Sequence, residues 1–215
     1  MKIYVVGSSK NRFFPLNNIR QKFLIDSPHD GDNIDSLNPW YCELTGLYYL
    51  WKHETDGIVG LEHYRRYFVN SKNQPLSENE ILELLKDTDI LCTKSWEYRK
   101  RFPVCMWAIR HHYNIEFEKF MSFAKLYVNE DYYNCCKEVY NSDHHILCNM
   151  MICRKETLNK YCEFIFDLLQ AYFECEKTYN RIPPKRIIGY FTEFFLRAWC
   201  LYAGKKYKFI KMRKC

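Results

Sequence analysis

Alternation between apolar and polar positions divides the chain into short strand-like runs and longer helical runs. Branched and aromatic residues between turn formers predict strands at residues 2–7, 57–62, 89–93, 145–153 and 206–212. Apolar residues at helical spacing predict helices at residues 40–51, 81–86, 115–140, 156–175 and 187–203. Ser77 and Glu80 spell a capping box in front of the second of these helices. Strands that alternate with helices indicate an α/β layered fold.

The length of 215 residues suits one ordinary domain, and the sequence contains no internal repeat and no Pro/Gly/Ser-rich linker. We therefore expect a single domain over residues 1–215. With 47% hydrophobic and 27% charged residues, the composition excludes a long disordered chain. Aromatic residues make up 18%, which suits a thick core or a site that stacks on bases and sugars.

Cysteine usage and hydropathy bear on the compartment. Eleven cysteines are an odd number, and no secretory leader precedes them, so we expect reduced thiols in the cytoplasm. The most apolar stretch, residues 164–173, is interrupted by Asp167 and Gln170 and is too short to cross a bilayer. The net charge of +6 gathers at the C-terminal end, which is either a solvated tail or a contact with anionic lipid or nucleic acid. The residues concerned are Lys205, Lys206, Lys208, Lys211, Arg213 and Lys214.

The main candidate for chemistry is the run of residues 62–68, which reads Glu-His-Tyr-Arg-Arg-Tyr-Phe. It follows a predicted buried strand, and ligands of open α/β sheets gather at the carboxyl ends of strands. Guanidinium groups bind phosphate oxygens bidentately and can stabilise a leaving diphosphate without a metal ion. The alternative is a solvated pair of surface arginines.

A second candidate is the acidic turn of residues 30–35. Asp30 and Asp32 form an Asp-x-Asp spelling that resembles the metal motif of many nucleotide-sugar enzymes, in which paired carboxylates hold Mg²⁺ or Mn²⁺. The alternative is a turn that Asn33 and Asp35 cap locally. No metal ligand is assigned, and Mg²⁺ or Mn²⁺ stays open as a cofactor.

Three later residues complete the candidates for chemistry. Glu193 is a carboxylate in an apolar helix, where burial would raise its pKa and suit it to proton transfer, unless Arg197 pairs with it four residues on. His144 precedes the strand that carries Asn149, and a neutral imidazole is a natural general base near pH 7.

In their order and spacing, several motifs resemble a family of bacterial capsular and exopolysaccharide glycosyltransferases that was long catalogued only as a domain of unknown function. The resemblance covers most of the chain. It rests on runs at residues 32–34, Asn38, 41–45, 51–52, 60–68, 149–152, 161–166 and 189–193. Three features depart from the family: Ser8-Ser9-Lys10-Asn11 replaces a His-Lys pair, Phe194-Phe195 replaces Arg-Leu, and many members are longer.

The resemblance implies a GT-A-like α/β fold with a mixed sheet flanked by helices, and transfer of a hexose from a UDP-sugar to a surface glycan or lipid-linked glycan. Galactose or galactofuranose is the sugar linked to the family. Such an enzyme would be cytoplasmic, at or near the inner face of the inner membrane, and would not bind nucleic acid.

Within this hypothesis, His63, Arg65 and Arg66 neutralise the diphosphate, with help from Lys10, and Glu193 is preferred to His144 as the base. The remaining candidates would contact the substrates: Asp30, Asp32, Asn33, Asn38, Tyr41, Glu43, Tyr64 and Asn149. The alternative from another class is a non-catalytic module that binds RNA or an anionic glycan.

Overall fold

The computed structural model describes residues 1–94, 103–143 and 146–214. The strands are β1 (Lys2–Gly7), β2 (Arg20–Leu24), β3 (Ile58–His63), β4 (Arg66–Phe68), β5 (Ile90–Lys94), β6 (Ile146–Arg154), β7 (Tyr207–Ile210) and β8 (Met212–Lys214). The α-helices are α1 (Asn38–Tyr41), α2 (Leu44–His53), α3 (Glu78–Leu84), α4 (Val104–Arg110), α5 (Asn114–Tyr127), α6 (Glu130–Tyr140), α7 (Lys155–Thr178) and α8 (Ile187–Tyr202). A 3-10 turn spans Asp35–Leu37.

All the strands named above belong to one mixed sheet with the order β2-β1-β3-β6-β5-β7, and β4 joins β3 to β8 beside this path. Strands β1, β2 and β3 pair in parallel, whereas β6 runs antiparallel to both of its neighbours, β3 and β5. The carboxyl ends of β1, β3 and β5 therefore share one edge of the sheet with the start of β6.

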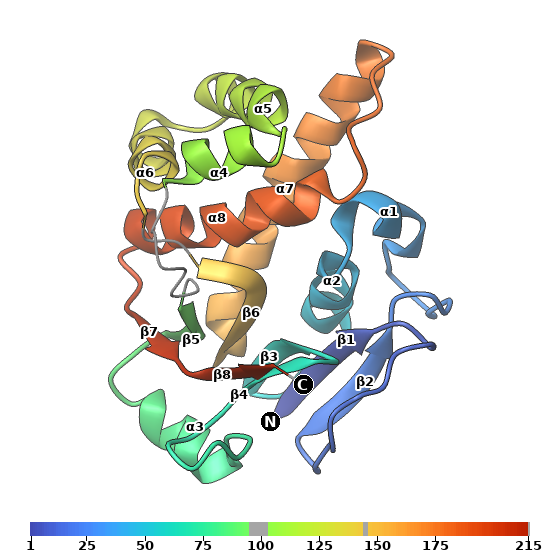
Figure 1. Ribbon diagram of the computed structural model, residues 1–215, viewed down its shortest axis with the longest axis vertical. Helices are drawn as coiled ribbons and strands as arrows, with labels where there is room; N and C mark the ends of the chain where they lie inside the picture. The colour runs from blue at the N-terminus through green and yellow to red at the C-terminus, as the bar shows by residue number, and fades with distance from the viewer. Residues whose placement is uncertain (95–102, 144–145, 215) are drawn as a thin grey trace.

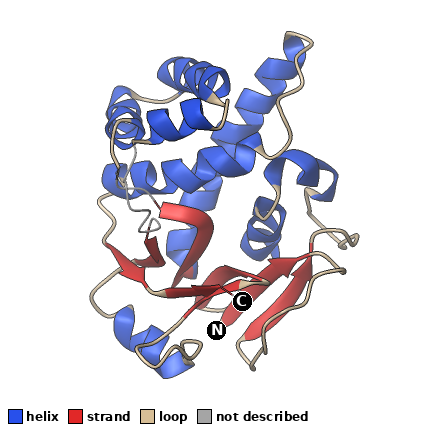
Figure 2. Cartoon of the chain, viewed as in Figure 1, coloured by secondary structure: helices blue, strands red, loops and turns tan. Residues whose placement is uncertain are grey.

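The helices cover the sheet unequally. Figure 1 shows α1, α2, α7 and α8 against one side, with α4, α5 and α6 stacked beyond α8, while α3 lies at the opposite side. Figure 2 shows the same separation, with the strands gathered below one large helical layer. The larger core cluster lies under that layer and includes Leu47, Leu61 and Phe195, each without exposed surface. A smaller cluster, which includes Ile81 and Phe68, packs beneath α3.

Most of the predicted elements are confirmed, and the structure divides three of them. The predicted helix 40–51 is interrupted at Cys42, whose φ of 51° leaves the helical region, so that α1 and α2 are separate. The helical pattern at 115–140 forms α5 and α6, and the predicted last strand forms β7 and β8. The capping box is present, because Ser77 Oγ accepts from Glu80 N–H and the Glu80 carboxylate accepts from Ser77 N–H. His145, the first residue of the predicted strand 145–153, lies outside the described residues.

Two strands and one α-helix were not predicted. Strand β2 is an edge strand that buries only Arg20 and Phe23, so its sequence lacks an apolar pattern. Strand β4 is three residues long and lies inside the run we interpreted as a site turn. Helix α4 is a seven-residue element with only Val104 and Ala108 buried. Short or exposed elements carry too few buried positions to show a period.

Candidate functional site

The His-Tyr-Arg-Arg run forms a tight hairpin at the carboxyl end of β3. His63 ends β3 and pairs with Arg66 at the start of β4, so Tyr64 and Arg65 form the turn. The turn is fixed to the end of β1, because Tyr64 N–H donates to the carbonyl of Val6 at 2.8 Å. A Cβ atom at Gly7 would lie 2.8 Å from Tyr64 Cβ, so this close approach requires glycine. The predicted placement of the run at a strand end is confirmed.

A buried ion pair holds the base of the hairpin. Arg20, from β2, donates from Nε and Nη2 to the two carboxylate oxygens of Glu62 at 2.7 and 3.1 Å, and both side chains are fully enclosed. Glu62 also accepts from Phe68 N–H at 3.0 Å, which ties β4 back to β3. A buried charge is tolerated when it is paired and hydrogen-bonded in this way. Glu62 thus fixes the position of the residues that follow it.

The start of β6 bulges into the same edge of the sheet. The pairing of β5 with β6 shifts register between Cys92 and Lys94, which face Met151 and Ile146. Within the extra residues, Cys148 and Asn149 have φ values of 67° and 50°. Consecutive left-handed non-glycine residues in a strand are strained, and bulges of this kind re-aim groups at functional sites.

The bulge contacts two other segments through Asn149, which is 1% exposed. Its Nδ2 atom donates to Glu43 Oε1 at 2.8 Å and to the carbonyl of Gly189 at 3.0 Å. Glu43 lies between α1 and α2, and Gly189 lies in the first turn of α8. Three segments separated by 106 and 40 residues along the chain therefore meet here.

Glu193 and His63 respond to this enclosure in opposite directions. Burial of the carboxyl group raises the pKa of Glu193 to about 8, and the Glu43 carboxylate adds to the rise. The Cys148 backbone, Arg66 and Arg186 counteract it. Burial lowers the pKa of His63, with Glu43 acting against that shift and Arg66 reinforcing it. Near pH 7 the imidazole is therefore neutral, so it offers a hydrogen bond to a ligand and not a positive charge.

Arg66 and Arg65 differ in their surroundings. Arg66 Nη1 lies 3.5 Å from His63 Nδ1, and Arg66 Nε is buried with no hydrogen-bond partner among the described residues. The same holds for His63 Nε2. Arg65 is exposed, with its guanidinium 5.4 Å from the centre of the Tyr64 ring. The hairpin thus presents one exposed cation, Arg65, and one half-buried cation, Arg66, whose buried Nε retains unused hydrogen-bonding capacity.

Lys10 lies near the same edge, in the loop that follows β1. Hydrogen bonds from Ser9 to Asp26 hold the loop. These bonds lower the pKa of Asp26, and the positive charge of the exposed Lys10 adds a smaller effect in the same direction. Lys10 and the hairpin are thus attached to the ends of neighbouring strands.

The acidic turn lies elsewhere. Asp32 accepts from the Tyr48 hydroxyl at 2.8 Å and lies 3.6 Å from Lys52 Nζ, both on α2. Asn33 donates to the carbonyls of His29 and Gly31, which closes the turn on itself. Because a helix rises about 1.5 Å per residue, Lys52 lies at the end of α2 that is remote from Glu43, and Tyr48 lies near the middle of the helix. The contacts described for Asp32 and Asn33 are thus with α2 and within the turn itself.

Asn38 and Tyr41 occupy α1. Tyr41 is 2% exposed and packs edge-to-face on Phe173 at 6.2 Å, and burial raises the pKa of its hydroxyl. Asn38 Oδ1 is buried, with no hydrogen-bond partner among the described residues. Tyr41 therefore belongs to the core beneath α7, whereas Asn38 retains a free acceptor. His144 lies outside the described residues.

Sequence reasoning missed Arg186 and Cys148. Arg186 caps α8 in a left-handed conformation with φ 68°, held by a hydrogen bond from its N–H to the Pro39 carbonyl, and its guanidinium lies 5.6 Å from the Tyr190 ring. Burial raises the pKa of the Cys148 thiol to about 12. No local motif marks either residue. The alternative partner of Glu193, Arg197, donates to Glu138 at 3.1 Å and to Tyr207 at 3.2 Å.

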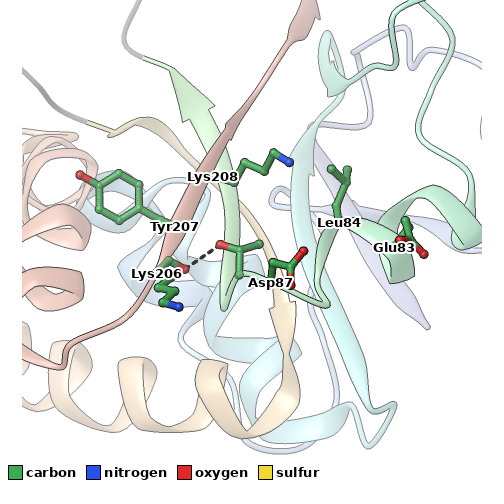
Figure 3. Close-up of a pocket in the computed structure, with 7 residues that line it drawn as sticks. Glu83, Leu84, Asp87, Lys206, Tyr207 and Lys208 are labelled. Atoms are coloured by element: carbon green, nitrogen blue, oxygen red, sulfur yellow. Dashed lines mark hydrogen bonds between the residues drawn. The ribbon is translucent and has the colours of Figure 1, made fainter.

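A separate surface hollow lies at the opposite edge of the sheet, where β5 and β7 begin (Figure 3). It is lined by Glu83, Leu84, Asp87, Thr88, Lys206, Tyr207 and Lys208. The Thr88 hydroxyl donates to the Lys206 carbonyl at 2.9 Å, which joins the two strand starts. Across residues 1–94, 103–143 and 146–214, no three His, Cys, Asp or Glu side chains are grouped so that they could hold a metal ion.

Two further features concern the cysteines and the helices. Each cysteine that the structure describes is a free thiol. In the described part of the chain, no helix combines the length and the apolar character that a membrane crossing requires.

One solved structure, described as the apo structure of the WbbM bifunctional glycosyltransferase, superimposes with a TM-score of 0.79 at 22% identity over 99% of this chain. The match spans 45% of that protein, so the chain corresponds to less than half of it. The mixed α/β fold with a central sheet flanked by helices is thus a fold found in a glycosyltransferase.

No curated protein matches the chain. Residues 3–205 match the family described as Domain of unknown function (DUF4422), which agrees with the family resemblance seen in the sequence. The chain therefore belongs to the DUF4422 family.

Proposed function

We propose that this protein is a glycosyltransferase that moves a sugar from a nucleotide diphosphate donor to a hydroxyl group of a bacterial surface glycan. One observation carries the proposal. The carboxyl group of Glu193 has a raised pKa, and the positive charge of Arg66, which follows a buried strand, acts on it electrostatically. The two residues are 127 positions apart along the chain. The shared fold with a glycosyltransferase supports the same reaction class.

The hairpin would stabilise the leaving group. As the bond to the anomeric carbon breaks, negative charge grows on the diphosphate, and fixed guanidinium groups stabilise that charge. Arg66 has an enclosed Nε without a partner among the described residues, and Arg65 is exposed beside it. A neutral His63 would donate one hydrogen bond, and Lys10 would add charge at the end of β1.

Glu193 would accept the proton of the acceptor hydroxyl. A carboxylate whose pKa lies near the working pH is a stronger base than an exposed glutamate and is still ionised in part. Burial beside Glu43 creates that condition, with the pKa of Glu193 at about 8. We therefore expect the ascending limb of the pH profile of kcat/KM to follow ionisation of this group in the free enzyme.

The family resemblance supports a UDP-hexose, galactose or galactofuranose, as the donor, and a glycan or lipid-linked glycan as the acceptor. With such an acceptor the enzyme would work at the cytoplasmic face of the inner membrane, where the basic C-terminal residues can meet anionic lipid. Asp32, Asn33, Asn38 and Tyr64 remain candidates for donor contacts, and Asp30 with Asp32 for a metal ion.

A nucleotide-release assay tests the proposal. Purified protein is incubated with a panel of UDP-, GDP- and other nucleotide sugars, with and without chelator, and free nucleotide is measured. We expect release from one donor class, accelerated by a glycan acceptor, and loss of release with chelator would assign a metal. Absence of release from every donor, together with strongly salt-dependent binding of RNA, would instead identify a binding module.

A further inference from the structure

The bulge at the start of β6 carries a residue whose side chain is committed to protein contacts. A primary amide nitrogen has two protons to donate. In Asn149 the two hydrogen bonds from Nδ2, to Glu43 Oε1 and to the Gly189 carbonyl, use both of them. The residue is 1% exposed, so its nitrogen has no proton left for a sugar or phosphate.

We infer that Asn149 is a positioning residue: its side-chain amide ties Glu43 to the first turn of α8 and so holds the Glu43 carboxylate close to Glu193. The inference rests on the proposed function in one respect, because it assigns Glu193 a role in proton transfer. It changes the role expected for Asn149 itself from substrate contact to support of the catalytic carboxyl group.

The local backbone explains why asparagine stands here. Residue 149 has φ 50°, a conformation that asparagine adopts more readily than most other residues. Aspartate would tolerate the backbone but would place another carboxylate against Glu43 and the Gly189 carbonyl. Glycine would tolerate the backbone and remove the two hydrogen bonds from Asn149 to Glu43 and Gly189, which we call the clamp. Substitutions at position 149 can therefore distinguish the requirement for a left-handed backbone from the requirement for a side-chain amide.

The clamp matters because Glu43 is one of several charged or titratable groups that act on Glu193. After burial, the Glu43 carboxylate is the largest cause that raises the pKa of Glu193. The positive charges of Arg66 in the hairpin and of Arg186 at the start of α8 oppose this rise in pKa. The groups that face Glu193 and its neighbours from each packed element are Cys42, Glu43, His63, Arg65, Arg66, Cys148, Arg186 and Tyr190.

The test is a titration of the side-chain carboxyl carbons of ¹³C-labelled glutamate by NMR, which needs no enzymatic activity. We expect Asn149→Gly to free the Glu43 side chain, so that the midpoint of Glu193 falls by at least about 0.5 pH unit. Asn180→Gly is the matched control, because Asn180 is exposed, also left-handed at φ 53°, and outside the site. A Glu193 midpoint that is the same in both variants and the wild type would overturn the inference.

A second measurement covers the case in which Asn149→Gly does not fold. In the wild-type protein, the side-chain amide protons of Asn149 should exchange slowly with solvent and shift as Glu43 titrates, and Glu43→Gln should abolish that shift. Fast exchange, or an amide signal indifferent to Glu43, would refute the clamp. Neither experiment uses turnover, so failure to find a sugar donor would overturn the proposed function and leave the clamp standing.

Discussion

The loop of residues 30–35 and the site around Glu193 both gather carboxylates, and they hold them in opposite ways. In the loop, Asp32 reaches a hydroxyl at 2.8 Å and a lysine at 3.6 Å, and its side chain stays 56% exposed. At the site, Glu193 is half-buried beside another carboxylate, and desolvation raises its pKa to about 8. The loop is stabilised by short-range contacts, whereas the site keeps a carboxyl group in unfavourable surroundings. Perturbed groups of the second kind are the better candidates for chemistry.

The largest expected effect comes from the half-buried carboxyl group of Glu193. Glu193→Gln keeps the shape of the side chain and removes its ability to accept a proton, so we expect the rate of sugar transfer to fall by about 10²- to 10⁴-fold. Steady-state turnover with the donor found in the panel assay measures it, and thermal unfolding checks that the variant is folded. Turnover within threefold of wild type would remove Glu193 as the base.

The next effect compares two cations. Arg66→Ala removes a half-buried guanidinium from the hairpin, and we expect kcat to fall by about 10²-fold if it stabilises the leaving diphosphate, with a similar loss for Arg65→Ala. Lys52→Ala removes the cation that lies 3.6 Å from Asp32 in the loop region. It should leave kcat unchanged. Equal losses for Arg66 and Lys52 would erase the distinction between the two regions.

The pH dependence of stability gives a third comparison. Because folding raises the pKa of Glu193 from 4.5 to about 8, the folded protein holds this proton more tightly than the unfolded chain. The contribution is therefore complete below pH 4.5 and is lost as the pH rises through about 8, with a slope of at most about 1.4 kcal/mol per pH unit. Urea unfolding from pH 5 to 9 should show this decline in the wild type and a weaker one in Glu193→Gln. Parallel curves would contradict the raised pKa.

The smallest effect is expected in the acidic loop. Asp32→Ala removes one hydrogen bond and one exposed ion pair, so we expect the free energy of unfolding to fall by less than about 1 kcal/mol. Calorimetric measurement of donor affinity distinguishes this small loss of stability from a role of Asp32 in binding the donor. A tenfold weaker affinity in a folded Asp32→Ala variant would support a contact between Asp32 and the donor, whereas unchanged affinity would limit Asp32 to a structural role.

The elements that the sequence predicts differ from those it does not predict in how many buried positions they contain. Periodic elements with many buried positions, such as α7, α8 and β3, were predicted, because burial imposes a pattern on the sequence. The edge strand β2 was not, although Arg20 on that strand forms the ion pair that anchors the hairpin. A single buried arginine has no period, and its partner Glu62 is 42 residues away.

Within the candidate site, the sequence by itself determined the hairpin run at a strand end and the presence of a carboxylate in the apolar helix α8. Tertiary structure alone decided that these two meet, that Asn149 is engaged with Glu43 and Gly189, and that Arg186 lies nearby. The physical reason lies in the range of the interactions. Hydrophobic period and turn chemistry act between neighbours along the chain, whereas burial and charge depend on which distant segments the sheet brings to one edge.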